Sequence, residues 1–226
     1  MIKYDIIILS GGKGTRVKKF TKNKPKCLID INGKPFLYHQ LKYLKKNNLK
    51  NVILSVGYLS EMVEEYVKKN IDFINVKIIS DGKKLLGTGG AIIKSINYMK
   101  KNFYVMYGDS YFDFNIKRLK QNNNRSIMAI YKNENKYDRS NIEIVDNDII
   151  HYYKSKTNNE LLYIDYGVSY LNKAFFKGVK KDSKFDLSVL FDKISRRNLL
   201  KGYVVKKRFY EIGSYHGIKE LINYLK

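Results

Sequence analysis

The chain has 226 residues, 44% of them hydrophobic, a formal net charge of +23 and a single cysteine. This length and composition suit one folded domain with a sizeable core and exclude a disordered chain. No apolar run approaches the roughly 20 residues that a membrane-spanning helix needs, and the first residues lack a signal-peptide pattern. Cys27 alone can form neither an internal disulfide nor a cysteine-rich zinc site. We therefore expect a soluble, cytoplasmic protein with a single domain at 1–226.

The high positive charge raises the question of a nucleic-acid partner. The lysines are spread along the whole chain among many Asn, Ile and Tyr residues. The sequence has neither an arginine-rich stripe nor the aromatic signature of an RNA-recognition motif. This spread favours a compositional bias that also attracts anionic substrates, and we expect no nucleic-acid partner.

The first half of the chain alternates apolar runs with amphipathic segments. The apolar runs predict buried strands at 5–10, 51–56, 76–79 and 103–107. Leucine spacing after Pro35, Ser60 as an N-cap followed by glutamates, and Ile92, Ile96 and Met99 on one stripe predict helices at 35–46, 60–69 and 89–101. Such alternation predicts βαβ units, with a mostly parallel sheet between two layers of helices.

The second half is richer in strands. Its sequence predicts strands at 125–131, 141–145, 149–154 and 163–171, with a turn at 146–148. Hydrophobic stripes predict helices at 187–194 and 214–226. The fold class is therefore α/β, a Rossmann-like doubly wound mixed sheet in one compact domain. We place a doubly wound half at 1–122 and a β-rich half with a closing helix at 123–226.

The segment "ILSGGKGTRV", residues 8–17, places three glycines at the end of the first predicted strand. Ligands of open parallel sheets bind beyond the carboxyl ends of the strands, and glycines there let a phosphate approach the backbone N–H groups. Arg16 and Lys26 offer positive charge to a di- or triphosphate. The spacing matches neither a Walker A loop nor Gly-x-Gly-x-x-Gly, because Val17 occupies the third glycine position. By itself, the loop also fits a turn that binds nothing.

Three further segments follow in order: "KPKCLIDINGKP" at 24–35, "LLGTGGAI" at 85–92 and "VMYGDSYFD" at 105–113. Together with Gly-Gly-Lys-Gly-Thr-Arg, they resemble the motifs of the sugar-1-phosphate nucleotidylyltransferases. "YIDYGVSYL" and "FYEIGSYHGIKELINYL" resemble the sugar-contacting strand and the closing segment of that family. The similarity extends over nearly the whole chain, so the ordered set is far more specific than any single motif.

This resemblance implies an enzyme that transfers a nucleotidyl group. An oxygen of a sugar 1-phosphate attacks the α-phosphorus of a nucleoside triphosphate in line, and pyrophosphate leaves. Phosphate is already a good nucleophile, so catalysis consists mostly of positioning and charge neutralisation. The resemblance makes 1–122 the nucleotide-binding half and 123–226 the half that binds the sugar phosphate.

The family roles fall on particular residues of this chain. Arg16 faces the departing pyrophosphate, Lys26 stabilises charge at the α-phosphate, and Asp109 binds a divalent ion, expected to be Mg²⁺. The nucleotide is held by Ser10, Gly11, Gly12, Gly14, Thr15, Gly87, Thr88 and Gly89. Purely structural alternatives are that Asp109 caps a turn, Lys26 is one solvated lysine among many, and Thr88 caps a helix.

The second half departs from the family pattern. Glu211 stands where the family has an aspartate as second metal ligand, and a glutamate is one methylene longer. Lys154 is placed at the lysine that grips the sugar phosphate, with Lys156 as a rival. Asp165 replaces the usual asparagine in the sugar-contacting strand, and the resemblance implies that Asp165 and Gly167 help to bind the sugar phosphate.

The choice of substrate is less constrained than the reaction. A stand-alone domain with Leu-Gly-Thr-Gly-Gly-Ala most resembles the heptose-1-phosphate guanylyltransferases of surface-polysaccharide pathways, which implies GTP and a heptose 1-phosphate. Alternatives are a cytidylyl- or uridylyltransferase acting on another sugar phosphate, or on phosphocholine through an acidic and aromatic site. Other classes are a non-catalytic nucleotide or nucleic-acid binding protein, and a glycosyltransferase whose Asp-x-Asp motif would be Asp146-Asn147-Asp148. The sequence leaves open whether the protein is a homodimer.

Overall fold

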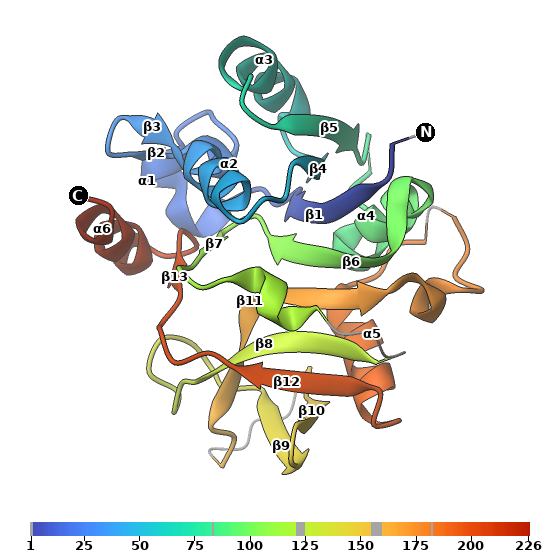
Figure 1. Cartoon of the computed structure of the whole chain (residues 1–226). Helices are drawn as coiled ribbons and strands as arrows, with labels where there is room; N and C mark the ends of the chain where they lie inside the picture. The colour runs from blue at the N-terminus through green and yellow to red at the C-terminus, as the bar shows by residue number, and fades with distance from the viewer. Residues whose placement is uncertain (1, 83, 121–124, 155–159, 182) are drawn as a thin grey trace.

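The computed structural model describes residues 2–82, 84–120, 125–154, 160–181 and 183–226. Nine strands of this described part form one mixed sheet in the order β5-β4-β1-β6-β11-β8-β12-β10-β9 (Figure 1). The first four are mutually parallel, whereas β11 runs antiparallel to both of its neighbours, β6 and β8. This is the mixed α/β sheet predicted from the sequence; the boundary between the halves at 122/123 lies outside the described residues.

The parallel part of the sheet is built from βαβ units. The chain starts at the central strand β1, adds β4 and β5 on one side, and then returns to add β6 on the other. At such a reversal the loops after the two central strands diverge and leave a crevice. The bounds are β1 (Tyr4–Ser10), α2 (Phe36–Lys46), β4 (Asn51–Val56), α3 (Ser60–Asn70), β5 (Asn75–Ser80), α4 (Gly87–Ser95) and β6 (Met99–Tyr107).

The other part of the sheet mixes strand directions. β11 (Tyr163–Asn172) changes its register to β8 between Asp165 and Ser169. The irregularity contains Gly167, whose φ of +94° suits glycine alone. The remaining elements of this part are β8 (Ser126–Lys132), β9 (Ile142–Asp146), β10 (Ile149–Tyr152), α5 (Leu187–Ser195) and β12 (Leu200–Val204).

Two short ladders and the last helix close one end of the molecule. β7 (Ser110–Tyr111) pairs with β13 (Tyr210–Glu211), and β2 (Asp30–Ile31) pairs with β3 (Lys34–Pro35). A small core that includes Ile218 and Leu221 of α6 (Tyr215–Tyr224) joins this end to the first loops of the chain. Short helical turns complete the connections: η1 (Thr15–Val17), α1 (Lys18–Thr21), η2 (Lys26–Leu28), η3 (Ile96–Tyr98), η4 (Ile116–Leu119) and η5 (Lys173–Phe176).

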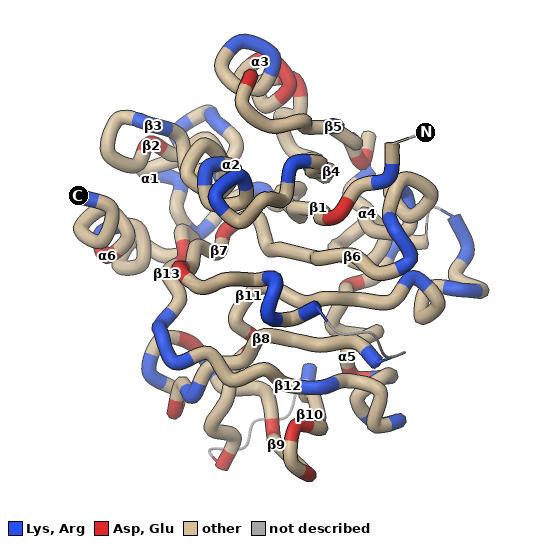
Figure 2. The backbone as a smooth tube through the Cα atoms, viewed as in Figure 1, with Lys and Arg blue, Asp and Glu red and all other residues tan. Residues whose placement is uncertain are grey.

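Lysine and arginine are distributed over helices, strands and loops of the whole fold, with fewer acidic residues between them (Figure 2). Some basic segments gather on the side where the N-terminus lies, around the start of β6. Within the described residues, no helix is both long enough and apolar enough to pass through a membrane.

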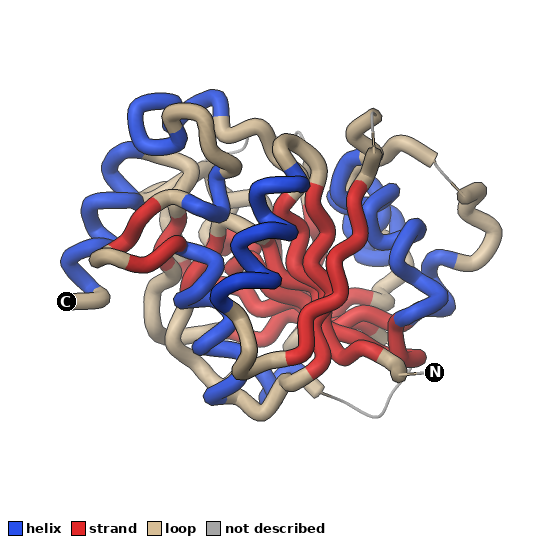
Figure 3. Tube along the Cα trace, turned by 90° about the horizontal axis from the view of Figure 1, so that it is seen from above, coloured by secondary structure: helices blue, strands red, loops and turns tan. Residues whose placement is uncertain are grey.

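Both faces of the sheet are buried, as the continuous apolar runs of its parallel strands require. Side chains alternate between the faces, so Ile6 and Ile8 of β1 join the core that includes α2 and α3. Ile7 and Leu9 join the core that includes α4 and α5. Figure 3 shows helices on either side of the strands. This two-sided burial holds the carboxyl ends of the central strands in fixed positions.

Three details differ from the sequence-based prediction. The helix predicted at 89–101 ends at Ser95, and Met99 is buried as the first residue of β6. Ser60 is the first helical residue of α3 rather than its N-cap, because Leu59 adopts the left-handed cap conformation, with φ of 52°. β12 was missed because a central glycine weakens its strand pattern; a Cβ on Gly202 would lie 2.6 Å from an Ile150 methyl carbon.

Candidate functional site

A cleft of about 580 Å³ opens at the carboxyl ends of β1 and β6, where the strand order reverses. The fold gathers here residues from four separate segments of the first half of the chain. Those predicted site residues that line the cleft are Ser10, Gly11, Gly12, Gly14, Thr15, Arg16, Lys26, Gly87, Thr88 and Asp109. Their common location agrees with the idea of one substrate site, while the role of each remains a prediction.

The first glycine loop presents uncovered backbone to the cleft. Gly11 packs against Gly57, where an added Cβ would lie 2.8 Å from the Gly11 carbonyl oxygen. A Cβ on Gly12 would meet no atom within 4 Å, so Gly12 faces open space. Gly14 adopts φ of +64° and turns the chain into η1, which carries Arg16. A loop with this exposed backbone and a cation behind it is suited to bind phosphate.

Lys26 and Asp109 form an ion pair with 2.8 Å between Nζ and Oδ2. Lys26 begins η2 directly after Pro25, and Asp109 follows β6 through Gly108. The Lys26 side chain is 14% exposed, whereas that of Asp109 is 39% exposed. The carboxylate therefore keeps a face toward the cleft, and the ammonium is held beside it at a defined position.

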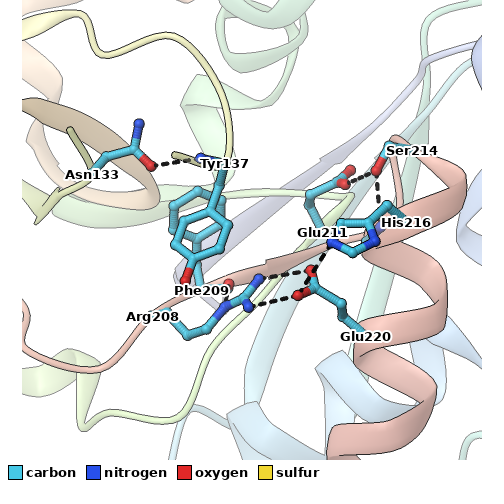
Figure 4. A network of polar contacts seen from close by, with 9 residues as sticks. Asn133, Tyr137, Arg208, Phe209, Glu211, Ser214, His216 and Glu220 are labelled. Atoms are coloured by element: carbon cyan, nitrogen blue, oxygen red, sulfur yellow. Dashed lines mark hydrogen bonds and ion pairs between the residues drawn. The ribbon is translucent and has the colours of Figure 1, made fainter. Parts of the chain in front are cut away.

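Glu211 reaches the neighbourhood of this pair through the β7–β13 ladder. Ile212 N donates to the Asp109 carbonyl oxygen at 3.0 Å, which fixes the two backbones side by side. The Glu211 carboxylate itself accepts hydrogen bonds from the Ser214 hydroxyl (Figure 4) and from Gly213 N. It is thus engaged at the start of α6 and is not among the residues that line the cleft. Its role as a second metal ligand remains a prediction.

The chemistry of the two carboxylates suits a loosely held divalent cation. Within the described residues, no three His, Cys, Asp or Glu side chains gather into a closed metal cage. Mg²⁺ often takes only one or two protein carboxylates and completes its octahedral shell with water and substrate phosphates. Asp109, open to the cleft and close in the fold to Glu211, fits this mode of binding.

The second glycine loop packs against the chain that precedes α5. Gly89 N donates to the Phe185 carbonyl oxygen at 3.0 Å, and Phe185 N donates to the Leu86 carbonyl oxygen at 3.1 Å. A Cβ on Gly89 would overlap the Phe185 ring, and one on Gly87, with φ of +75°, would lie 2.6 Å from the Phe185 carbonyl oxygen. Gly87 lines the cleft, whereas Gly89 is buried in this contact.

Thr88 links the same loop to Asp186, the N-cap of α5. Its hydroxyl donates to Asp186 Oδ1 at 3.2 Å and accepts from Leu187 N at 2.7 Å. Burial opposes ionisation of Asp186, but hydrogen bonds from Ser188 and Thr88 and the charge of Lys154 outweigh it, so its pKa is lowered. Lys154 is exposed and lies on this side of the cleft, while its rival Lys156 lies outside the described residues.

Asp165 is connected to the cleft by a hydrogen bond with Tyr107. The Tyr107 hydroxyl donates to Asp165 Oδ2 at 3.1 Å, and Gly167 N donates to Oδ1 at 2.9 Å. Burial raises the pKa of the Asp165 carboxyl to about 6, although both hydrogen bonds favour its ionised form. Tyr107 lines the cleft; Asp165 and Gly167 do not. A Cβ on Gly167 would lie 2.7 Å from the Ser110 Cβ, which explains the glycine.

Asp81, Tyr107 and Asp186 are among the cleft residues that were not predicted as site residues from the sequence. Asp81 follows β5 at its carboxyl end, so its place in the chain was a usable signal. Its Oδ2 accepts from Leu86 N at 3.1 Å, while its buried Oδ1 has no hydrogen-bond partner in the described part of the chain. Burial raises the pKa of this carboxyl.

An acidic and aromatic cluster lies near the closing segment, and it bears on the phosphocholine alternative. The Arg208 guanidinium makes paired hydrogen bonds of 2.8 and 2.9 Å to Glu220 (Figure 4). It also lies 4.0 Å from the ring centroid of Tyr137 and 4.6 Å from that of Tyr210. The cluster is therefore filled by a cation of the protein itself, so it offers no place for a quaternary ammonium.

The Asp-x-Asp candidate for a glycosyltransferase lies in the turn between β9 and β10. Asp148 pairs there with Lys201 at 2.6 Å between Oδ2 and Nζ. Neither Asp146 nor Asp148 lines the cleft.

Known proteins are similar to this chain over most of its length. Residues 5–156 match the family model described as nucleotidyl transferase. A D-glycero-alpha-D-manno-heptose 1-phosphate guanylyltransferase of Campylobacter jejuni is 34% identical over 209 residues, covering 92% of this chain and 93% of the relative. The same description is attached to a protein of Aneurinibacillus thermoaerophilus, 28% identical over 92% of this chain and 93% of its own length.

A solved structure extends this similarity to three dimensions. The crystal structure of HddC from Yersinia pseudotuberculosis complexed with GMP-PN has a TM-score of 0.83 and 26% sequence identity to this chain. The similarity covers 99% of this chain and all of that one.

Proposed function

The chain belongs to the nucleotidyl transferase family, and from this premise we propose that it joins GTP to a heptose 1-phosphate. A phosphate oxygen of the sugar forms a bond to the α-phosphorus while the bond to the bridging oxygen of the β-phosphate breaks. The products are a GDP-heptose and pyrophosphate. The observation that carries the proposal is the Lys26–Asp109 pair beside the open backbone of the glycine loop, in one cleft.

The residues of the cleft divide the work of charge neutralisation. The loop at 10–16 binds the phosphates through its backbone, and Arg16 neutralises the departing pyrophosphate. Lys26 meets the negative charge that develops at the α-phosphate in the transition state. Asp109 would hold Mg²⁺, together with Glu211 once the Glu211 carboxylate gives up its hydrogen bonds from Gly213 and Ser214. When bound, the ion would supply Lewis-acid stabilisation to the phosphates.

The preference for guanine is supported by Asp81 as well as by the relatives. Its carboxylate lines the cleft next to the glycine loop, and one of its oxygens lacks a partner among the described residues. Guanine carries two adjacent donors, N1–H and the 2-amino group, on one edge of the base. Oδ1 is buried and Oδ2 accepts from Leu86 N, so a turn of the Asp81 side chain has to bring the unpaired oxygen to the cleft when the base binds. A carboxylate turned in this way favours such a base over bases that present an acceptor at that position.

The sugar 1-phosphate is assigned to the side of the cleft formed by Tyr107, Asp186 and the neighbouring Lys154. Lys154 is a flexible, exposed cation suited to a phosphate. Tyr107, held by Asp165, places a hydroxyl at the cleft wall for the sugar.

The test is pyrophosphate release with GTP, ITP, ATP, CTP, UTP and dTTP, each combined with heptose, mannose and glucose 1-phosphates in the presence of Mg²⁺. We expect GTP with heptose 1-phosphate to exceed the other common triphosphates by about 100-fold in kcat/KM. ITP, which lacks the 2-amino group, should fall between GTP and the others. A higher kcat/KM with a pyrimidine triphosphate, or with glucose 1-phosphate, would overturn the respective half of the proposal.

Asp81→Asn isolates the reading of the base. It should lower kcat/KM for GTP by about 10- to 100-fold and remove the difference between GTP and ITP, because the acceptor for the 2-amino group is weakened. Asp72→Asn, at an exposed carboxylate, is the matched control and should leave both values unchanged. An Asp81→Asn enzyme that still prefers GTP over ITP would exclude this role.

A further inference from the structure

A second hollow, of about 770 Å³, lies at the amino end of β6, whereas the cleft lies at the carboxyl end of that strand. It is formed where β6 starts and where β11 ends and turns into η5. β6 runs nine residues from this hollow to the cleft, so the two are separated by roughly 25 Å along the strand. A ligand here would therefore leave the cleft open.

Five lysines line this hollow, which we call the lysine groove: Lys3, Lys100, Lys101, Lys173 and Lys177. They belong to three segments that are far apart in the sequence, and Figure 2 shows basic segments gathering on this side of the molecule. The fold thus concentrates here charge that the sequence spreads over the whole chain.

The charge of the lysine groove is only partly compensated. Lys100 pairs with Asp5 at 2.6 Å, and Lys3 Nζ donates to the Asn97 carbonyl oxygen at 2.7 Å. The side-chain ammonium groups of Lys101, Lys173 and Lys177 have no hydrogen bond or ion pair to any described residue. Burial and the nearby charge of Lys3 lower the pKa of Lys173. An anion placed between these ammonium groups would relieve this repulsion.

Between the lysines, the surface of the lysine groove is largely apolar. Ile96, Met99 and Phe176 contribute to its lining. Ile2, next to Lys3 in the chain, is 59% exposed, the highest value among the large hydrophobic side chains that the structure describes. Met99 and Phe176 are buried in the floor of the groove, so the apolar group free to enter lipid is Ile2, which precedes Lys3 and is not itself part of the lining. An exposed apolar side chain next to flexible lysines is a combination that anchors proteins to anionic lipid surfaces.

We propose that the lysine groove docks the protein reversibly on an anionic phospholipid surface. The ammonium groups meet the headgroups, and Ile2 enters the boundary between headgroups and acyl chains. Lysine, a flexible point charge, suits the diffuse charge of headgroups better than a single phosphate that requires a fixed fork of donors. The cleft then faces away from the lipid, so substrates enter it from solution. This proposal does not depend on the identity of the substrates.

A matched pair of triple variants tests the proposal, because a protein of charge +23 binds anionic vesicles weakly through any face. Lys101→Gln/Lys173→Gln/Lys177→Gln removes three charges from the lysine groove, and Lys68→Gln/Lys206→Gln/Lys219→Gln removes three exposed charges elsewhere. Both variants lose three positive charges. Binding is measured by co-sedimentation with vesicles of phosphatidylglycerol and phosphatidylcholine in physiological salt.

The first variant should bind about 100-fold more weakly than wild type, since each lysine near an anionic surface contributes about 1 kcal/mol. The second should change by less than about threefold, because in the docked orientation its lysines lie beyond a Debye length of about 8 Å. Unchanged enzymatic turnover in both variants confirms that they fold. Equal loss of binding in the two variants would overturn the proposal, as would wild-type binding that is no tighter to these vesicles than to single-stranded RNA.

The absence of tryptophan from the sequence allows a second, independent test. Ile2→Trp introduces a single tryptophan whose emission should shift to shorter wavelength when the vesicles are added. Val204→Trp, at an exposed position elsewhere in the fold, is the control and should show no shift. If the protein sediments with the vesicles but Ile2→Trp shows no shift, the lysine groove is not the docking face.

Discussion

The two halves of the sheet approach the same cleft by different means. On the parallel side, the loops after β1 and before α4 bring backbone to the cleft with little side-chain volume. On the mixed side, the contribution comes from side chains: Asp165 accepts a hydrogen bond from Tyr107 at the end of β6, and Asp186 caps α5. On the proposed function, the backbone binds the triphosphate group, which is the same in every nucleotide substrate. The side chains bind the sugar, which is the more variable substrate.

The largest effect is expected from Asp109→Ala, which removes the carboxylate paired with Lys26 on the parallel side. Turnover should fall by about 1,000-fold or more, because the metal loses its main ligand and Lys26 its partner. Millimolar Mg²⁺ should not rescue it in a pyrophosphate-release assay. Asp113→Ala, which removes a carboxylate paired with Lys207 at the surface, should remain close to wild type. An Asp109→Ala enzyme with more than a few per cent activity would remove Asp109 from the metal site.

Lys26→Ala should lower kcat by about 100- to 1,000-fold with a much smaller change in KM for GTP. The charge it meets develops mainly in the transition state. Steady-state kinetics at saturating Mg²⁺ separate the two constants, and Lys24→Ala, at an exposed neighbouring lysine, is the control. A change confined to KM would make Lys26 a ground-state binder and shift the catalytic role to Arg16.

Glu211→Gln tests the point where the two halves meet. The Mg²⁺ concentration needed for half-maximal activity should rise by about 10- to 100-fold, because the second carboxylate loses its charge. Glu211→Asp, which restores the usual family residue but shortens the side chain, should give an intermediate value. Titrations of activity with Mg²⁺ measure both. If the Gln variant keeps its metal requirement and rate, the hydrogen bonds to Gly213 and Ser214 are the whole function of Glu211.

Two glycine substitutions distinguish ligand contact from packing within the parallel side. Gly12→Ala should leave the unfolding free energy nearly unchanged, since its Cβ meets open space, but should raise KM for GTP about tenfold if phosphates approach there. Gly89→Ala should instead lower the unfolding free energy by about 1–3 kcal/mol, because the Cβ overlaps the Phe185 ring. Urea unfolding and steady-state kinetics of both variants check this; the reverse pattern would contradict it.

The smallest effect is expected for Asp165, the partly buried acid of the mixed side. The folded protein raises the pKa of Asp165 to about 6, above its unfolded value, so folding favours the protonated carboxyl. The contribution of this group to the unfolding free energy is therefore most favourable below about pH 4. It decreases as the pH rises from about 4 to about 6. Asp165→Asn should remove this fall. The difference in unfolding free energy between variant and wild type should therefore be about 2 kcal/mol more favourable to the variant at pH 7 than at pH 4. Urea unfolding at the two pH values measures it; parallel curves for wild type and variant would contradict the assignment.

Much of the fold was predictable because its signals are local. The apolar runs of β1 and β4 and the stripe of α5 follow from periodicity alone. The errors occur where contacts with distant residues determine the secondary structure. Met99 was assigned to the stripe of a helix but belongs to a strand that pairs with β1. β12 was missed because its central glycine, which packs against Ile150, weakens the strand pattern. Asp81 was missed because it belongs to no glycine motif, although its position directly after β5 was a usable signal.

By itself, the sequence determined the class of fold, the main strands in their order along the chain, and the segments that form the cleft. Hydrophobic periodicity and glycine spacing act over a few residues, so these features can be read locally. The tertiary structure alone decided what surrounds them. It placed Phe185 against Gly89, engaged Glu211 at the start of α6, and left an oxygen of Asp81 unpaired beside the glycine loop. It also gathered five scattered lysines into one groove. These features depend on side chains that meet across long stretches of chain, and no local pattern encodes such meetings.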